Sequence, residues 1–116
     1  MTVVKFTMDE RKQSATLRVK GHVGWNVAGD DIVCAAISIL AYTLAQNIKI
    51  AYERGLLKYL PRIKLKEGDA IITSRAADSD AYNEILHMYL YTQTGYQVLA
   101  HNYPKYVILE MFGTAE

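Results

Sequence analysis

Apolar and polar residues alternate in two segments near the start of the chain, residues 4–8 and 15–20. A period of two is typical of a half-buried β-strand, with one face toward the core and one toward water. Residues 9–13 between the two segments are polar and predict a turn. The first twenty residues are therefore predicted to form a β-hairpin.

Apolar residues then recur at helical spacing over a long segment that begins after residues 22–29. Asp30 is the predicted N-cap, and Asp31 adds negative charge at the helix N-terminus. Gly55 follows the last periodic residues and is the predicted C′ residue. The helix would hold about 24 residues and be roughly 36 Å long. Its apolar stripe consists of Ile32, Ala36, Ile39, Leu40, Thr43, Leu44, Asn47, Ile48 and Ala51.

A second helix is predicted to begin at a cap formed by Ser79 or Asp80 and to end before Pro104. Its stripe consists of Ile85, Tyr89, Thr92, Tyr96, Leu99 and Tyr103. This spacing runs straight through Gly95, so Gly95 is kept inside the helix at a cost of about 1 kcal/mol. The residues Ile85, Tyr89, Tyr96 and Leu99 are also the predicted contact stripe of a homodimer, because two long helices should not hide every apolar face against one sheet.

Three further strands complete the predicted order. Residues 62–66 and 70–74 flank a turn at 67–69 and predict a second hairpin, and residues 106–112 predict a last strand. The order is ββαββαβ. It predicts an α+β fold in which two helices pack on a five-stranded sheet, as a single domain over residues 1–116.

Composition narrows the functional classes. The chain has 116 residues, 51% of them hydrophobic, and a formal net charge of +1, which makes nucleic acid an unlikely partner. A single cysteine fits a reducing compartment, and the first residues show no signal peptide. The longest apolar run, residues 32–45, is shorter than the roughly 20 residues that span a bilayer. We expect a cytoplasmic protein that does not enter the membrane.

Candidate chemistry lies around the only cysteine. Cys34 would be the fourth residue of the first long helix, near backbone N–H groups that favour a thiolate. His22 follows the first hairpin and could act as base and then acid toward that thiol. By spacing alone, the alternative of a small buried thiol is the commoner one. A metal site is weaker still, because the histidines at 22, 87 and 101 show no paired-ligand spacing with Cys34, so neither metal nor cofactor is expected.

The surrounding residues resemble a known signature. Gly21-His22, a gap of eleven residues, and then Asp31-Ile32-Val33-Cys34-Ala35-Ala36-Ile37-Ser38 are similar to the signature of the ribosomal-processing cysteine proteases, small proteins of bacteria and phages. The two hairpins, the helix that starts near the cysteine, and Asn102-Tyr103 before a final strand also resemble this family. The resemblance covers nearly the whole chain.

This resemblance implies a dyad formed by His22 and Cys34 and an endopeptidase that cuts after aromatic residues. The implied substrate is a large-subunit ribosomal protein, from which a short N-terminal extension is removed. It also implies a homodimer formed through helices. Asp31 would orient His22 or tune the helix end, and Ser38 would lie near the thiol. The alternatives are an ordinary helix-end charge for Asp31 and a packing residue for Ser38.

The loop that follows the first hairpin is a candidate substrate loop. Gly21, Gly24 and Gly29 would let it move, and Trp25 could cover an apolar substrate side chain. A plain surface connection is the alternative. Trp25-Asn26 and the tyrosine-rich second helix depart from the family pattern, which leaves open a phage-type protease that acts on a virion structural protein. Two further possibilities are a non-catalytic dimeric module that binds an assembly protein and, ranked last, a small RNA-binding protein. Lys58, Arg62, Lys64 and Lys66 would form a basic strand face, for which contact with ribosomal RNA phosphates is one interpretation and a solvated sheet face the commoner one.

Overall fold

The computed structural model describes residues 1–21 and 30–112. The elements are β1 (Thr2–Asp9), β2 (Ser14–Lys20), α1 (Asp30–Glu53), β3 (Arg62–Lys66), β4 (Asp69–Arg75), α2 (Ser79–Asn102) and β5 (Val107–Glu110). This is the predicted ββαββαβ order. The predicted α+β fold, with two helices packed on a five-stranded sheet, is confirmed.

The five strands form one mixed sheet in the order β3-β4-β2-β1-β5. Both predicted hairpins are present, with β1 antiparallel to β2 and β3 antiparallel to β4. β2 and β4 join the hairpins, also in antiparallel pairing, and β5 lies parallel to β1 at the far edge. Sequence periodicity predicted the strands but not these two longer-range pairings.

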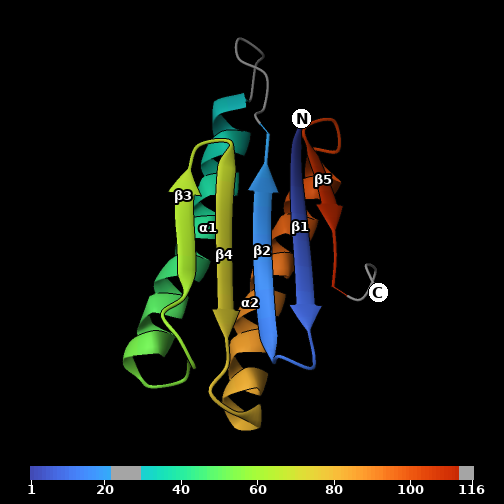
Figure 1. Cartoon of the computed structure of the whole chain (residues 1–116). Coiled ribbons are helices and arrows are strands. Elements are labelled where there is room, and N and C mark those ends of the chain that lie inside the picture. The colour runs from blue at the N-terminus through green and yellow to red at the C-terminus, as the bar shows by residue number, and fades with distance from the viewer. Residues whose placement is uncertain (22–29, 113–116) are drawn as a thin grey trace.

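Both helices cover the same face of the sheet, and the other face carries no helix (Figure 1). The covered face presents the apolar positions of each strand, such as Val4 and Phe6 on β1 and Leu17 on β2, all of which are buried. Phe6 packs against Tyr96 and Phe112, with ring centroids 5.9 and 5.5 Å apart. The core therefore lies between the sheet and the helix pair.

Helix α1 ends as predicted. Gly55 has a positive φ of 80°, which a glycine adopts without steric cost. Its N–H donates to the carbonyl of Tyr52, and the N–H of Leu56 donates to the carbonyl of Ala51, both at 3.0 Å. These two bonds satisfy carbonyls at the helix end, as in a Schellman motif.

The N-cap of helix α2 lies one residue before the predicted caps, so that prediction was wrong. Asp78 is the N-cap, and its side chain accepts a 2.8 Å hydrogen bond from the N–H of Ala81. Ser79 is the first helical residue, and its hydroxyl accepts a 2.8 Å hydrogen bond from the side-chain amide of Gln13. Gly95 lies inside the helix, as predicted. A Cβ at this position would come within 2.6 Å of Cδ2 of Leu40 on α1. The glycine lets the two helices approach each other closely.

The last strand is shorter than predicted. β5 covers Val107–Glu110, whereas residues 106–112 were expected. The N–H of Tyr106 donates to the carbonyl of Tyr103 in a turn, and the N–H of Phe112 donates to the side chain of Gln93 on α2. Tyr106 therefore belongs to the turn before β5, and Phe112 packs against the core. Neither residue extends the strand.

The stripe predicted for a dimer contact is buried within the single chain, so this part of the prediction was wrong. Ile85, Tyr89, Tyr96 and Leu99 are at most 8% exposed and face the core. Helical periodicity identified the buried face of α2, which the sheet and α1 together cover. The apolar side chains left uncovered on the helices are Ile32, Ile39, Tyr42, Ile50, Tyr52, Tyr91 and Val98.

One helix of the described chain is long and apolar enough to cross a membrane by length and composition. This is Ile32–Glu53 within α1, with a mean hydropathy of 1.4. Such a result is weak evidence, because the core helix of a globular protein passes the same test. Leu44, Ile48 and Ala51 of this helix are fully buried against the rest of the structure.

Candidate active site

Gly21 fixes the direction in which the chain leaves β2. Its φ of 99° lies in the region that favours glycine, and a Cβ there would collide with the carbonyl oxygen of Met1. The N–H of Gly21 donates to the carbonyl of Gly68 at 3.0 Å, and the hydroxyl of Thr2 donates to the carbonyl of Gly21 at 3.4 Å. These contacts determine where the next residue, His22, enters its loop.

His22, Gly24, Trp25 and Gly29 lie outside the described residues, as do the side chains of Asp30 and Asp31. The predicted geometry of the dyad and the substrate loop therefore remains a prediction. The end of β2 and the start of α1, which flank the loop, lie at the same end of the molecule (Figure 1). Eight residues connect the two positions.

Cys34 is half-buried on α1, where it packs against the hydrophobic core. Because α1 begins at Asp30, Cys34 is the fifth residue of the helix and not the fourth, just past the first turn. Side chains on a helix lean toward its N-terminus, so the thiol is directed back over that first turn. The partial exposure leaves the side chain open to a peptide or a reagent.

A small hollow lies beside this part of α1. Ile37, Ser38, Ala41 and Tyr42 form one wall, in the turns that follow Cys34. The opposite wall comes from β2 and from the β3–β4 hairpin and consists of Val19, Leu65, Lys66, Glu67, Gly68 and Ala70. Ser38, predicted to lie near the thiol, is half-buried at this hollow one helical turn after Cys34. Val19, near the end of β2, thus lies across this hollow from the part of α1 that follows Cys34.

Tyr96 anchors this region of α1 to α2. Its hydroxyl donates a 2.8 Å hydrogen bond to the carbonyl of Ile37, three residues after Cys34. Burial raises the pKa of Tyr96 well above its ordinary value, so the phenol stays protonated and remains a donor. Sequence reasoning treated Tyr96 only as an apolar stripe residue. A buried tyrosine that must find a hydrogen-bond partner was the available signal.

The other two histidines, His87 and His101, are exposed on α2, and Nδ1 of His87 lies 2.7 Å from the carbonyl of Asn83. Within residues 1–21 and 30–112, no group of three or more His, Cys, Asp or Glu side chains could hold a metal ion.

Solved structures share this fold. The essential ribosomal processing protease Prp of S. aureus, crystallised with a substrate peptide, matches with a TM-score of 0.66 and 19% identity, over 97% of this chain and 99% of that chain. The same protease with a covalently linked product peptide gives a TM-score of 0.65 and 21% identity, over 97% and 99%. SMU.848 from Streptococcus mutans gives 0.67 and 20%, over 97% and 95%.

Two helices on a five-stranded sheet, with a half-exposed cysteine near the start of the first helix, define a small cysteine protease. The sequence profile of the family described as cysteine protease Prp matches residues 1–108, so the chain belongs to this family. The predicted family and enzyme class are confirmed. No curated protein matches the sequence significantly.

Proposed function

We propose that the protein is an endopeptidase that removes a short N-terminal extension from a large-subunit ribosomal protein by cutting after aromatic residues. The observation that carries the proposal is Cys34, half-buried near the start of α1 in a chain that belongs to the cysteine protease Prp family. The fold neighbour from S. aureus is named as a ribosomal processing protease and was crystallised with a substrate peptide, which supports a protein substrate here. Such a substrate would be met in the cytoplasm.

In the proposed mechanism, His22 takes the proton of Cys34, and the thiolate sulfur attacks the scissile carbonyl carbon. His22 then gives the proton to the departing amine, and a thioester remains on Cys34. Water, deprotonated by the same imidazole, hydrolyses the thioester and releases the N-terminal fragment. Asp31 is proposed to orient His22. Backbone N–H groups at the start of α1 are the nearest candidates to stabilise the oxyanion, and loss of one such donor typically lowers the rate about 10²- to 10³-fold.

The hollow beside α1 supports the proposed aromatic specificity. Val19, Ile37, Ala41 and Leu65 give it apolar walls, and Tyr42 adds an aromatic edge. The hollow holds about 40 Å³, whereas a cavity that admits benzene holds about 150 Å³. A phenyl ring of the substrate would therefore have to widen it, with Trp25 of the loop as a cover. Because this contact would hold the substrate in the transition state as well as before it, truncation of the ring should lower kcat/KM.

The test is cleavage of a peptide with two consecutive phenylalanines against its alanine analogue. We expect the phenylalanine peptide to be cleaved at least about 100-fold faster in kcat/KM, which corresponds to roughly 3 kcal/mol. Tyr42→Ala should reduce this preference, whereas Tyr52→Ala, an exposed tyrosine later on α1, should not. Equal cleavage of both peptides would remove the aromatic pocket. Cleavage of a virion protein but not of the ribosomal extension would favour the phage-type alternative.

A homodimer is part of the same proposal, with a different contact surface from the one first predicted. An apolar groove runs between the helices and is lined by Ile32, Ala36, Ile39, Leu40, Gly95, Val98, Leu99, Asn102 and Tyr103. Ile32, Ile39 and Val98 along it are 65%, 59% and 57% exposed. Apolar side chains grouped in this way mark interaction sites, and the groove begins one turn from Cys34, so a second copy would also shape the active site.

A further inference from the structure

The uncovered face of the sheet concentrates positive charge. Strand alternation places seven basic side chains on it: Lys5, Arg18, Lys20, Arg62, Lys64, Lys66 and Arg75. Only Asp9, Asp69 and Glu110 oppose them. The face thus carries a formal charge of +4, although the whole chain carries +1. The remaining six basic and nine acidic residues of the sequence give a formal charge of −3, so the positive charge is concentrated on this face.

The strand register groups most of these cations at the end of the sheet near Gly21. Lys20 and Lys66 both lie opposite Asp69, on β2 and β3. Arg18 and Lys64 flank Ile71 in the next row, and Lys5 is the partner of Arg18 on β1. Four neighbouring strands thus contribute to one basic area.

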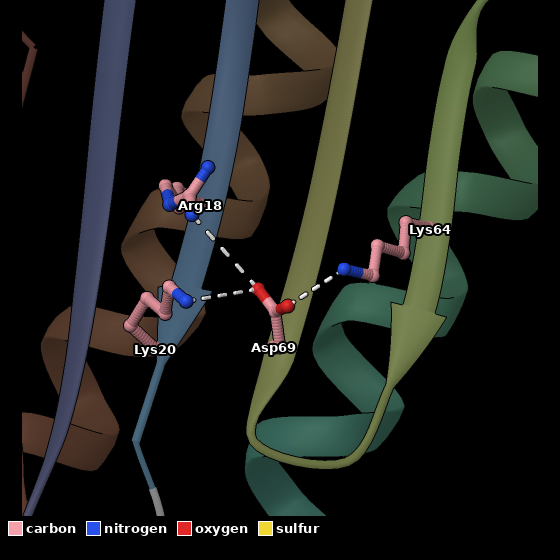
Figure 2. A network of polar contacts seen from close by, with 4 residues as sticks. All are labelled: Arg18, Lys20, Lys64 and Asp69. Atoms are coloured by element: carbon pink, nitrogen blue, oxygen red, sulfur yellow. Dashed lines mark hydrogen bonds and ion pairs between the residues drawn. The ribbon is translucent and has the colours of Figure 1, made fainter.

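Asp69 is the acidic centre of this area, and it is less exposed than the cations around it (Figure 2). Its carboxylate lies 2.7 Å from Lys64, 3.5 Å from Lys20 and 3.9 Å from Arg18. The hydrogen bond from Lys64 is the main cause that lowers the pKa of Asp69, so the carboxylate stays charged. One carboxylate holds three cations in place and neutralises one, which leaves an excess of positive charge for a partner.

Apart from Val3, Ile71 and Ile108, the rest of this face is polar and suits phosphate better than a protein surface. Thr7, Thr16 and Thr73 lie in one row, and the hydroxyls of Thr16 and Thr73 are 3.1 Å apart. Serine and threonine hydroxyls commonly bind phosphate and sugar oxygens. The core of a protein–protein interface is depleted of charge, and this face has charge at its centre.

We propose that this uncovered face, residues of β1 to β4 that point away from the helices, binds the backbone of an RNA duplex. A broad sheet face with cations and hydroxyls matches the wide, shallow minor groove of A-form RNA, which displays 2′-hydroxyls and is recognised through 2′-hydroxyl and phosphate contacts across it. The 2′-hydroxyls give the threonine row partners that DNA lacks. Of the residues that line the hollow beside α1, only Lys66 belongs to this face, so the enzyme would cut protein while it is held on RNA.

The experiment measures fluorescence anisotropy of a labelled RNA duplex of about 16 base pairs, the length that a double-stranded RNA-binding domain spans. We expect binding that weakens steeply as salt rises from about 50 to 200 mM. Arg18→Gln with Lys20→Gln should weaken it about tenfold and reduce the salt slope by about 2. The matched control, Lys49→Gln with Arg54→Gln, removes the same charges from the α1 side and also breaks an exposed ion pair, Arg54–Glu84. It should bind within about twofold of wild type.

Arg18 and Lys20 both form ion pairs with Asp69, so a second variant removes two cations that do not. Arg62→Gln with Lys66→Gln on β3 should give the same loss. Absence of RNA binding at about 50 mM salt, equal losses in the test and control variants, or equally tight binding of a DNA duplex of the same sequence would each overturn the proposal. Because binding is measured without cleavage, its failure is distinct from failure of the proposed protease activity.

Discussion

At the scale of single residues, Gly21 explains why a glycine precedes the predicted catalytic histidine. The position combines a positive φ with an approach to Met1 that leaves no room for a Cβ. Gly55 also has a positive φ, but no atom lies within 4 Å of a Cβ built there. A comparison of Gly21 with Gly55 therefore separates the cost of a positive φ from the cost of a steric collision with the added Cβ.

Gly21→Ala is expected to lower both stability and turnover, because the added methyl group must displace β1 and redirect His22. We expect a loss of stability about 1–3 kcal/mol larger than for Gly55→Ala, which meets only the backbone cost. Thermal unfolding and peptide cleavage of both variants measure the two effects. Unchanged turnover in a folded Gly21→Ala protein would show that Gly21 does not position the histidine.

The sequence pattern could identify the need for glycine at position 21 but not its cause. The signature places Gly21 before His22, whereas the collision involves Met1, twenty residues earlier, and depends on the register of β1 and β2. Asp78 shows the same limit. Three successive residues, Asp78 to Asp80, can each cap a helix, and only the backbone geometry selects the first. The position of His22 relative to Cys34 depends on the conformation of the loop, which local sequence patterns do not determine.

At the scale of the elements, α1 and α2 are joined by one buried hydrogen bond close to the active site. Tyr96 on α2 donates to the carbonyl of Ile37 on α1. Tyr89, two turns earlier on α2, makes comparable bonds to the sheet, at 2.8 Å to the hydroxyl of Ser74 and 3.2 Å to the carbonyl of Ile72. Helical spacing predicted that both tyrosines are buried, but not that their hydroxyls bind different elements.

Tyr96→Phe is expected to cost about 1 kcal/mol of stability and to lower kcat several-fold, because the segment that carries Cys34 loses its anchor. Tyr89→Phe should destabilise the fold at least as much, since it leaves Ser74 without this partner, while kcat stays near the wild-type value. Denaturant unfolding and steady-state cleavage compare the two. Equal effects on kcat would mean that Tyr96 acts only through stability.

At the scale of the whole molecule, the net charge of the chain does not show how charged residues are distributed over its surface. A net charge of +1 predicted little affinity for nucleic acid, yet the uncovered sheet face carries +4. The helix side carries the apolar groove instead. The strand periods predicted which residues point outward, but the order β3-β4-β2-β1-β5, which collects the cations on neighbouring strands, came from tertiary pairing.

Val98→Glu is expected to separate the proposed dimer, because it places a charge in the apolar groove between the helices. Light scattering of the wild type at micromolar concentration should give twice the chain mass of 13.1 kDa, and Val98→Glu should give the single mass. Ile108→Glu is the control, since Ile108 is an exposed apolar residue of β5 on the other side. A wild-type mass of 13.1 kDa would exclude the dimer.

The most direct test of the proposed His22–Cys34 dyad is kcat/KM for a peptide with two consecutive phenylalanines, measured for wild type, Cys34→Ala, His22→Ala and His101→Ala. Cys34→Ala should abolish cleavage, because no other cysteine exists in the chain. His22→Ala should lower kcat/KM by about 10²- to 10⁴-fold, the usual contribution of a general acid–base group. His101→Ala, an exposed histidine at the end of α2, should keep wild-type activity. Cleavage by Cys34→Ala at the wild-type rate, or an effect of His22→Ala no larger than that of His101→Ala, would contradict the dyad.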